Sequence, residues 1–88
     1  MNVVLVEYDP EAQATYVTLG DTEPSSHVEI QAETVAVDVD ADGIPTGVEL
    51  LVPPTDVTRD MLSAVSERFP GLGERVADAL TGTGYHAA

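Results

Sequence analysis

The carboxylates between Asp38 and Glu49, in the stretch DVDADGIPTGVE, have the clearest potential for chemistry. Acidic residues stand at positions 1, 3 and 5 of this stretch, glycine at position 6 and glutamate at position 12. This is the spacing of an EF-hand loop, whose oxygen ligands wrap around one Ca²⁺ ion. Taken letter by letter, the stretch is a candidate calcium site.

The flanks of this stretch favour a β-hairpin instead. An EF-hand loop needs a helix on each side, whereas residues 33–40 carry valine at every second position, as a half-buried strand does. Pro45, at loop position 8, has no N–H to offer a partner loop. Asp42-Gly43 is a strong signal for a two-residue type I′ turn. We therefore predict a hairpin, with weak Ca²⁺ binding as the lesser alternative.

A turn at Asp42-Gly43 also predicts the register of the hairpin. The expected pairs are Ala41 with Ile44, Val39 with Thr46, Val37 with Val48, and Val35 with Leu50. Apolar or threonine side chains then share one face, and the other face takes Asp38, Asp40 and Glu49. A slip by one residue would move every side chain to the wrong face.

The rest of the chain predicts an α+β fold: a small antiparallel β-meander of four to five strands, followed by one or two C-terminal α-helices. Three strands are expected before the hairpin, at residues 2–8, 14–19 and 26–31, with short connections that favour antiparallel neighbours. Pro53-Pro54 ends the sheet because proline cannot donate to a strand ladder. We expect a single domain over residues 1–88, with the sheet in 1–52, a helical segment in 55–81 and a flexible tail in 82–88.

Helical periodicity begins after the two prolines. Thr55, Asp56 and Thr58 are candidate N-caps for a helix that runs to about Phe69. Pro70-Gly71 interrupts the pattern, and a second short helix is expected from about residue 72 to residue 80. Apolar residues recur on one stripe of this segment: Leu62, Val65, Phe69, Leu72, Val76, Ala79 and Leu80. The default role of such a stripe is to cover the sheet.

The net charge of −13 limits the classes of partner. Sixteen acidic residues stand against three arginines and no lysine, so the surface repels phosphate backbones and anionic lipid. We expect no nucleic-acid and no membrane partner. The charge favours a basic protein partner, or solubility in a salty cytoplasm. No cysteine, signal-peptide pattern or membrane-span pattern is present, which predicts a cytoplasmic protein.

Catalytic patterns are weak. The two histidines, His27 and His86, are expected on the outer face of a strand and in the tail, and neither belongs to a Ser-His-Asp arrangement. Tyr8 and Tyr16 are expected to pack across the first hairpin. The sequence therefore predicts no enzyme activity, and it identifies no catalytic, cofactor-binding or metal-binding residues.

Residues 5–52 resemble a widespread family of small bacterial proteins that is known mainly as a domain of unknown function. The resemblance rests on YDPEAQATYVTL at residues 8–19, VDVDADG at residues 37–43 and GVELL at residues 47–51. The typical family pattern reads YDPEADALYIRL, followed by a VDLDEDGRxVGIEIL hairpin. This chain departs from it at Gln13, Thr15 and Thr18, where the family usually has Asp, Leu and a basic residue. The resemblance implies a small antiparallel sheet, no established enzyme activity, and frequent occurrence beside small toxin-like partners.

Three classes of function are compatible with these patterns. The first is a small acidic protein-binding module, of an antitoxin-like kind, that neutralises or docks a basic partner. The second is a structural homo-oligomer built by the helices and the sheet edge. Such a homodimer would use the unprotected edge at Val3–Val6, the apolar stripe of the helices, or the outward Ala36 and Leu51. The third is a weak Ca²⁺-binding domain at residues 38–49. We favour the first.

Overall fold

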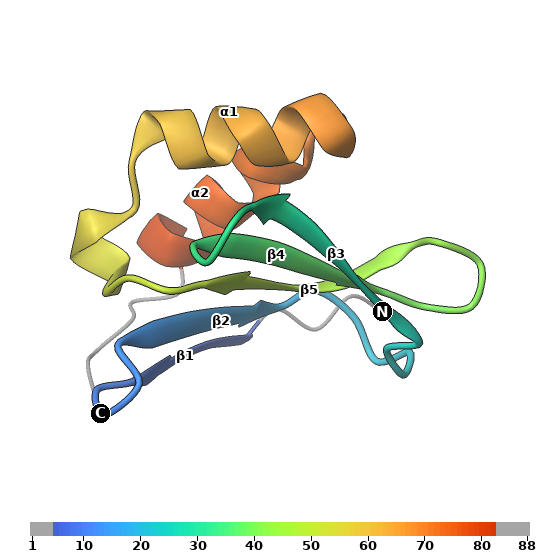
Figure 1. Cartoon of the computed structure of the whole chain (residues 1–88), viewed down its shortest axis with the longest axis horizontal. Coiled ribbons are helices and arrows are strands. Elements are labelled where there is room, and N and C mark those ends of the chain that lie inside the picture. The colour runs from blue at the N-terminus through green and yellow to red at the C-terminus, as the bar shows by residue number, and fades with distance from the viewer. Residues whose placement is uncertain (1–4, 83–88) are drawn as a thin grey trace.

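The computed structural model describes residues 5–82 (Figure 1). Five strands, a 3₁₀ turn and two helices follow one another: β1 (Leu5–Asp9), β2 (Ala14–Thr18), β3 (Ser26–Gln31), β4 (Val35–Val39), β5 (Pro45–Leu50), η1 (Pro54–Asp56), α1 (Arg59–Arg68) and α2 (Leu72–Gly82). This confirms the predicted α+β fold. Residues 2–4 of the first predicted strand and residues 83–88 of the predicted tail lie outside the described residues. Gly82, the first residue of that predicted tail, is the last residue of α2.

The strand order departs from a simple meander. The order across the sheet is β1-β2-β5-β4-β3, and all neighbours are antiparallel. After β2 the chain therefore crosses to the far edge, and β3, β4 and β5 return toward β2. Burial explains this order: β4 and β5 are almost wholly buried and take central places, whereas the more polar β1 and β3 take the edges.

The register predicted for the β4–β5 hairpin is confirmed along the body of the strands. Val35 lies opposite Leu50, and Val37 lies opposite Val48. Both valines and Val48 are at most 2% exposed, so the alternation of valines does mark the buried face. The stretch that spells an EF-hand loop is therefore flanked by strands and not by helices.

The predicted two-residue type I′ turn is wrong. The loop has three residues, 41–43, closed by a hydrogen bond of 2.9 Å from the Asp40 N–H to the carbonyl oxygen of Ile44. Gly43 has a φ of 81°, and Asp42 does not adopt positive φ. Asp40 provides the physical reason, because its Oδ1 accepts the N–H of Asp42 at 2.9 Å and that of Ile44 at 3.0 Å.

The longer loop shifts the pairing next to it. Val39 lies opposite Pro45 and not opposite Thr46, and the register is irregular between Asp38 and Val39. The Thr46 side chain is 4% exposed, and its Oγ1 donates to the carbonyl oxygen of Asp38 at 3.2 Å. The bulge thus keeps a polar side chain satisfied inside the sheet.

Two helices cover one face of the sheet, which we call the inner face (Figure 1). Thr58 caps α1, because its side chain accepts the Met61 N–H at 3.2 Å. Gly73 allows α1 and α2 to approach closely, since a Cβ there would collide with the carbonyl oxygen of Leu62. The buried core lies between sheet and helices: Val17, Leu19, Val35, Val37, Val39, Val48, Leu50, Met61, Val65, Leu72, Val76 and Ala79.

The helix ends fall close to the predicted ones. Of the three candidate N-caps, Thr58 begins α1, while Thr55 and Asp56 lie in the 3₁₀ turn. The apolar stripe faces the sheet as expected, with Val65 and Val76 fully buried. None of the helices in residues 5–82 combines the length and apolarity that a bilayer span requires.

Candidate functional site

The opposite face of the sheet, which we call the outer face, is not covered by either helix (Figure 1). Strand pairing arranges its side chains in two rows across the sheet. The first row is Glu7, Tyr16, Glu49, Ala36 and Glu29. The second row is Leu5, Thr18, Gly47, Asp38 and His27. The outer face is therefore rich in carboxylates, in contrast to the apolar inner face.

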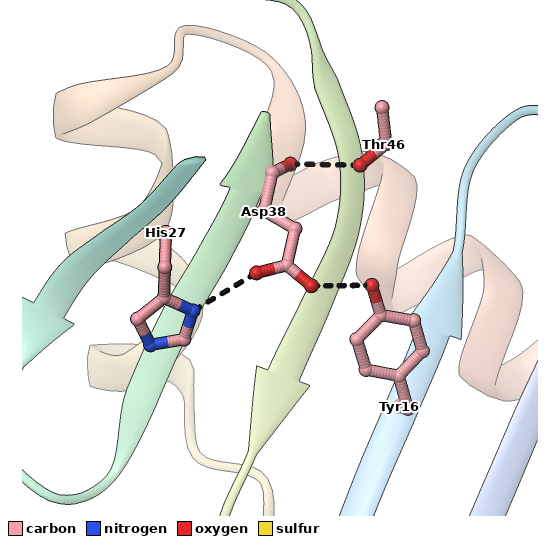
Figure 2. Close-up of polar contacts among 4 residues, drawn as sticks. All are labelled: Tyr16, His27, Asp38 and Thr46. Carbon is pink, nitrogen blue, oxygen red and sulfur yellow. Dashed lines mark hydrogen bonds and ion pairs between the residues drawn. The ribbon is translucent and has the colours of Figure 1, made fainter. Parts of the chain in front are cut away.

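Asp38 is the centre of a polar network on this face, and Figure 2 shows its contacts. Its Oδ2 accepts the Tyr16 hydroxyl at 2.7 Å, and its Oδ1 lies 2.9 Å from Nδ1 of His27. The three side chains come from β2, β4 and β3. Because β5 lies between β2 and β4, the network spans four of the five strands. The Asp38 side chain is 23% exposed and that of His27 is 57% exposed, which leaves the network open to solvent on the histidine side.

Gly47 makes the contact between Tyr16 and Asp38 possible. Strand β5 lies between β2 and β4, so the tyrosine ring must cross β5 to reach the carboxylate. A Cβ at Gly47 would collide with the hydroxyl and the ring of Tyr16. Glycine in the middle of a strand normally weakens it, and here it provides the space for the ring.

Both titratable partners of Asp38 have altered pKa values. The hydrogen bond to Asp38 raises the pKa of His27, and nearby negative charges add to this effect while slight burial opposes it. Burial is the largest cause that raises the pKa of Tyr16, followed by the hydrogen bond to Asp38 and the charges of Asp38 and Glu49. Tyr16 therefore stays a neutral donor over the physiological range.

The geometry assigns the protons. An ionised carboxylate only accepts, so His27 Nδ1 carries a hydrogen and Nε2 is the acceptor when the ring is neutral. Within residues 5–82 no Ser or Thr hydroxyl is hydrogen-bonded to His27, so the pair has no nucleophile of a Ser-His-Asp kind beside it. The network can hold a proton and fix the orientation of the imidazole.

A groove with a volume of about 190 Å³ lies beside the network. Its lining includes His27, Glu29, Glu33, Glu49 and Leu51. Three acidic residues thus share the lining with Leu51, an apolar residue that is 41% exposed. Such a groove suits a cationic side chain with an apolar stem, such as lysine or arginine.

The carboxylates of residues 38–49 do not converge. Asp38 faces Tyr16 and His27, whereas Asp40 is bonded to the backbone of its own loop. Glu49 lies in the neighbouring row of the outer face, opposite Ala36. In the part of the chain that the structure describes, no group of three or more Asp, Glu or His side chains is placed to hold a metal ion.

The expectation that Tyr8 and Tyr16 pack across the first hairpin is wrong for Tyr16. Tyr8 pairs with Thr15, Tyr16 pairs with Glu7, and the alternation of the strands places the two rings on opposite faces. Tyr16 leaves its own hairpin and reaches across β5 to Asp38. In the sequence, the feature that could have predicted this contact is Gly47, because an isolated glycine within a strand indicates that another group approaches the backbone closely.

Four other residues, predicted on the surface or in the tail, have different outcomes. His27 does lie on the outer face of a strand, and His86 lies outside the described residues. Ala36, expected to add an outward apolar surface, is only 6% exposed because its neighbours cover it, whereas Leu51 is well exposed.

The fold and the polar network define the class of this protein: a five-stranded antiparallel sheet with helices on one face and an open acidic face on the other. The chain belongs to the family described as Protein of unknown function (DUF2283), whose match covers residues 5–52. All five strands and the whole Asp38 network lie inside the match, and both α-helices lie outside it. No curated protein and no solved structure matches the chain.

Proposed function

We propose that this protein is a small acidic binding module that docks a basic protein partner on the outer face of its sheet. One observation carries the proposal: charge is segregated between the two layers. Residues 5–52 contain eleven of the 16 acidic residues and none of the three arginines. Residues 53–82 contain five acidic residues and all three arginines, which lie in α1 and α2.

The open face favours binding for electrostatic reasons. A surface of one sign attracts an oppositely charged partner from a distance and raises the association rate. The groove beside His27 offers such a partner a local contact, because Glu29, Glu33 and Glu49 line it together with Leu51. A lysine or arginine side chain placed there would pack its stem on the leucine and pair its charge with the carboxylates.

An antitoxin-like role is the specific form of this proposal. In that role the module would neutralise its partner by covering a basic functional surface. Its support is the acidic outer face together with the resemblance of residues 5–52 to a family that often occurs beside toxin-like proteins. We place this non-catalytic role in the cytoplasm, which the absence of cysteine fits, since no disulfide stabilises the chain.

A homodimer is the second candidate, favoured by one observation. Strand β1 is an edge of the sheet, and its Leu5 is 49% exposed. A second copy could extend the sheet there by strand pairing. Glu7 and Asp9 in the same strand would then bring like charges together. Sedimentation over a range of concentrations tests this candidate, and a concentration-dependent mass without any partner would support it over the first.

Matched charge variants test the binding module. The outer-face variant is Glu29→Gln with Glu49→Gln, and the control is Glu67→Gln with Asp78→Asn on the helices, which removes the same charge. Each protein is immobilised for affinity capture from native lysate at low salt, and titrated with a defined arginine-rich peptide. We expect the outer-face variant to lose capture and to bind the peptide several-fold more weakly, while the control behaves like the parent protein.

Three results would count against this proposal. The first is an equal loss in both variants, which would show that only net charge matters. The second is capture that does not weaken as salt rises, since an electrostatic contact at a surface is screened over about 10 Å at 0.1 M. The third is a peptide that perturbs the amide signals of the helices and leaves those of the outer face unchanged.

A further inference from the structure

The β4–β5 loop and the turn between α1 and α2 lie toward the same end of the molecule (Figure 1), and residues from both segments line a second surface there. A hollow of about 310 Å³ lies there, and we call it the end hollow. Its lining is almost entirely apolar: Gly43, Ile44, Pro45, Phe69, Pro70 and Leu72, with Arg75 as the single charged residue. The volume is at the lower end of the range for binding pockets, about 300–1,000 Å³.

The apolar wall of the end hollow is exposed. Ile44 is 58% exposed, the most exposed of the large hydrophobic residues in the described chain. Phe69, the only phenylalanine of the sequence, is half-buried beside it. Exposed apolar side chains that gather in one hollow are a common mark of an interaction site.

The charge at the end hollow is opposite to that of the rest of the surface. Within residues 5–82 the guanidinium of Arg75 makes no hydrogen bond and no ion pair. Arg68 lies with its guanidinium carbon 5.3 Å from the centroid of the Phe69 ring. Two of the three cations of the chain are therefore in or beside the hollow. The neighbouring Glu74 is engaged elsewhere, because its carboxylate accepts the Ser66 hydroxyl at 3.2 Å.

We propose that the end hollow docks a peptide segment of a partner protein in which an aliphatic or aromatic side chain stands next to a carboxylate. The apolar side chain would pack on Ile44 and Phe69, and the carboxylate would pair with the guanidinium of Arg75, which offers two donors in a plane. Charge complementarity selects this occupant, since the end hollow combines an apolar wall with an unpaired guanidinium in a chain of net charge −13.

The salt dependence of this contact differs from that of the outer face. The net charge of the chain repels an acidic peptide over a distance, while Arg75 attracts its carboxylate at short range. Salt screens the long-range repulsion first, because the Debye length falls to about 10 Å at 0.1 M. Binding at the end hollow should therefore hold or strengthen as salt rises to that level, whereas binding of a basic partner to the outer face should weaken.

Titration of the ¹⁵N-labelled protein with short peptides tests the proposal. The probe is a peptide with blocked termini that contains Phe flanked by Asp. Two control peptides replace the Phe by Ala or the Asp by Lys. We expect the probe to shift amide signals of residues 43–45 and 69–75, with a dissociation constant of the order of 0.1–1 mM, as suits a small open hollow. Both control peptides should bind at least several-fold more weakly.

Substitutions of exposed side chains separate docking from folding. Arg75→Gln should weaken binding of the probe by about three- to tenfold, the range for one charge-assisted contact at a surface. Arg59→Gln at the start of α1 removes the same charge away from the end hollow and should leave binding unchanged. Ile44→Ser should also weaken binding. Circular dichroism of each variant checks that the fold is retained.

Several outcomes would overturn the proposal. One is that a millimolar concentration of the probe shifts no amide signals, or shifts only those of the outer face. Another is that the Lys-containing peptide binds as tightly as the probe. A third is that Arg59→Gln and Arg75→Gln weaken binding of the probe equally. Equally tight binding of free phenylpropionate would assign the end hollow to small carboxylates. A dimer that Arg75→Gln dissociates would assign it to a second copy of the chain. None of these results depends on whether the outer face binds a basic partner.

Discussion

The two faces of the sheet share the same strands but are held together in different ways. In β4, Val37 points into the core and is fully buried, while the next residue, Asp38, points outward and bonds to Tyr16 and His27. The inner face gains its stability from apolar burial, which is large and has little directional preference. The outer face gains a defined geometry from directional polar bonds. The two helices cover the inner face, and they leave the outer face open.

A charge on the inner face should have the largest effect. We expect Val37→Asp to lower the free energy of unfolding by about 4 kcal/mol or more, because the new carboxylate would be buried without a partner. That is a large part of the total stability of a small domain, about 5–15 kcal/mol. Urea denaturation followed by circular dichroism measures the change. Leu5→Asp, on the outer face, should change stability by no more than about 0.5 kcal/mol. Equal losses would mean that the two faces do not differ as described.

Filling the gap at Gly47 should have the next largest effect. We expect Gly47→Ala to cost about 1–3 kcal/mol, because the added methyl group forces the Tyr16 ring away and breaks its bond to Asp38. The cost should fall sharply in a Tyr16→Ala background, where no ring remains to collide. Urea denaturation of the four proteins of this double-mutant cycle gives the coupling. Additive costs would show that the ring does not cross β5 above the glycine.

Removal of the tyrosine hydroxyl should have a smaller effect. Tyr16→Phe keeps the ring over Gly47 and deletes only the donor to Asp38, so we expect a loss of about 1 kcal/mol in the free energy of unfolding. The same deletion in Tyr8→Phe serves as a control, since Tyr8 lies on the other face. Proton-detected spectra should show the His27 signals moving in the Tyr16 variant and not in the control. Unchanged His27 signals would contradict a shared network.

The protonation of His27 should give the smallest signal. The bond to Asp38 raises the pKa of His27 in the folded chain, so its contribution to stability is fully present below the unfolded pKa of about 6.5 and is lost as pH rises through the folded value. NMR titration of the imidazole signals measures this pKa directly. We expect a value above 6.5 that returns toward 6.5 in Asp38→Asn. An unaltered pKa in that variant would exclude Asp38 as its cause.

Local patterns in the sequence predict the elements well. The alternation of valines from Val35 to Val39 places the buried face and the register with Val48 and Leu50, because one face of a strand must be apolar if the other is wet. The residues of the turn are less predictable, since the side chain of Asp40 replaces the expected type I′ geometry with a longer loop. The dipeptide Asp-Gly is compatible with the two-residue turn that was predicted and with the three-residue loop that is observed.

The candidate site is not predictable from local patterns. Tyr16, Asp38 and His27 meet only because β5 lies between β2 and β4, and because β3 pairs with β4 at the edge. The spacing of residues in the sequence does not predict this strand order. In a simple meander, β2 would lie next to β3. Gly47 gave a local hint of a close approach, but the identity of the approaching ring depends on the strand order. The end hollow likewise joins residues 43–45 to residues 69–75 through the tertiary fold.

The strand order also has a consequence for the path of folding. The hairpin β1–β2 and the three-stranded unit β3–β4–β5 are each made of neighbours in sequence, and the seam between them pairs Thr15 with Leu50 and Val17 with Val48. Closing this seam requires contacts between distant parts of the chain, which are slow to form because loop-closure entropy must be overcome first. We expect the two units to form early and the seam to limit the rate. The connection over residues 19–25 would then act as a tether whose length sets the speed of folding more than the final stability.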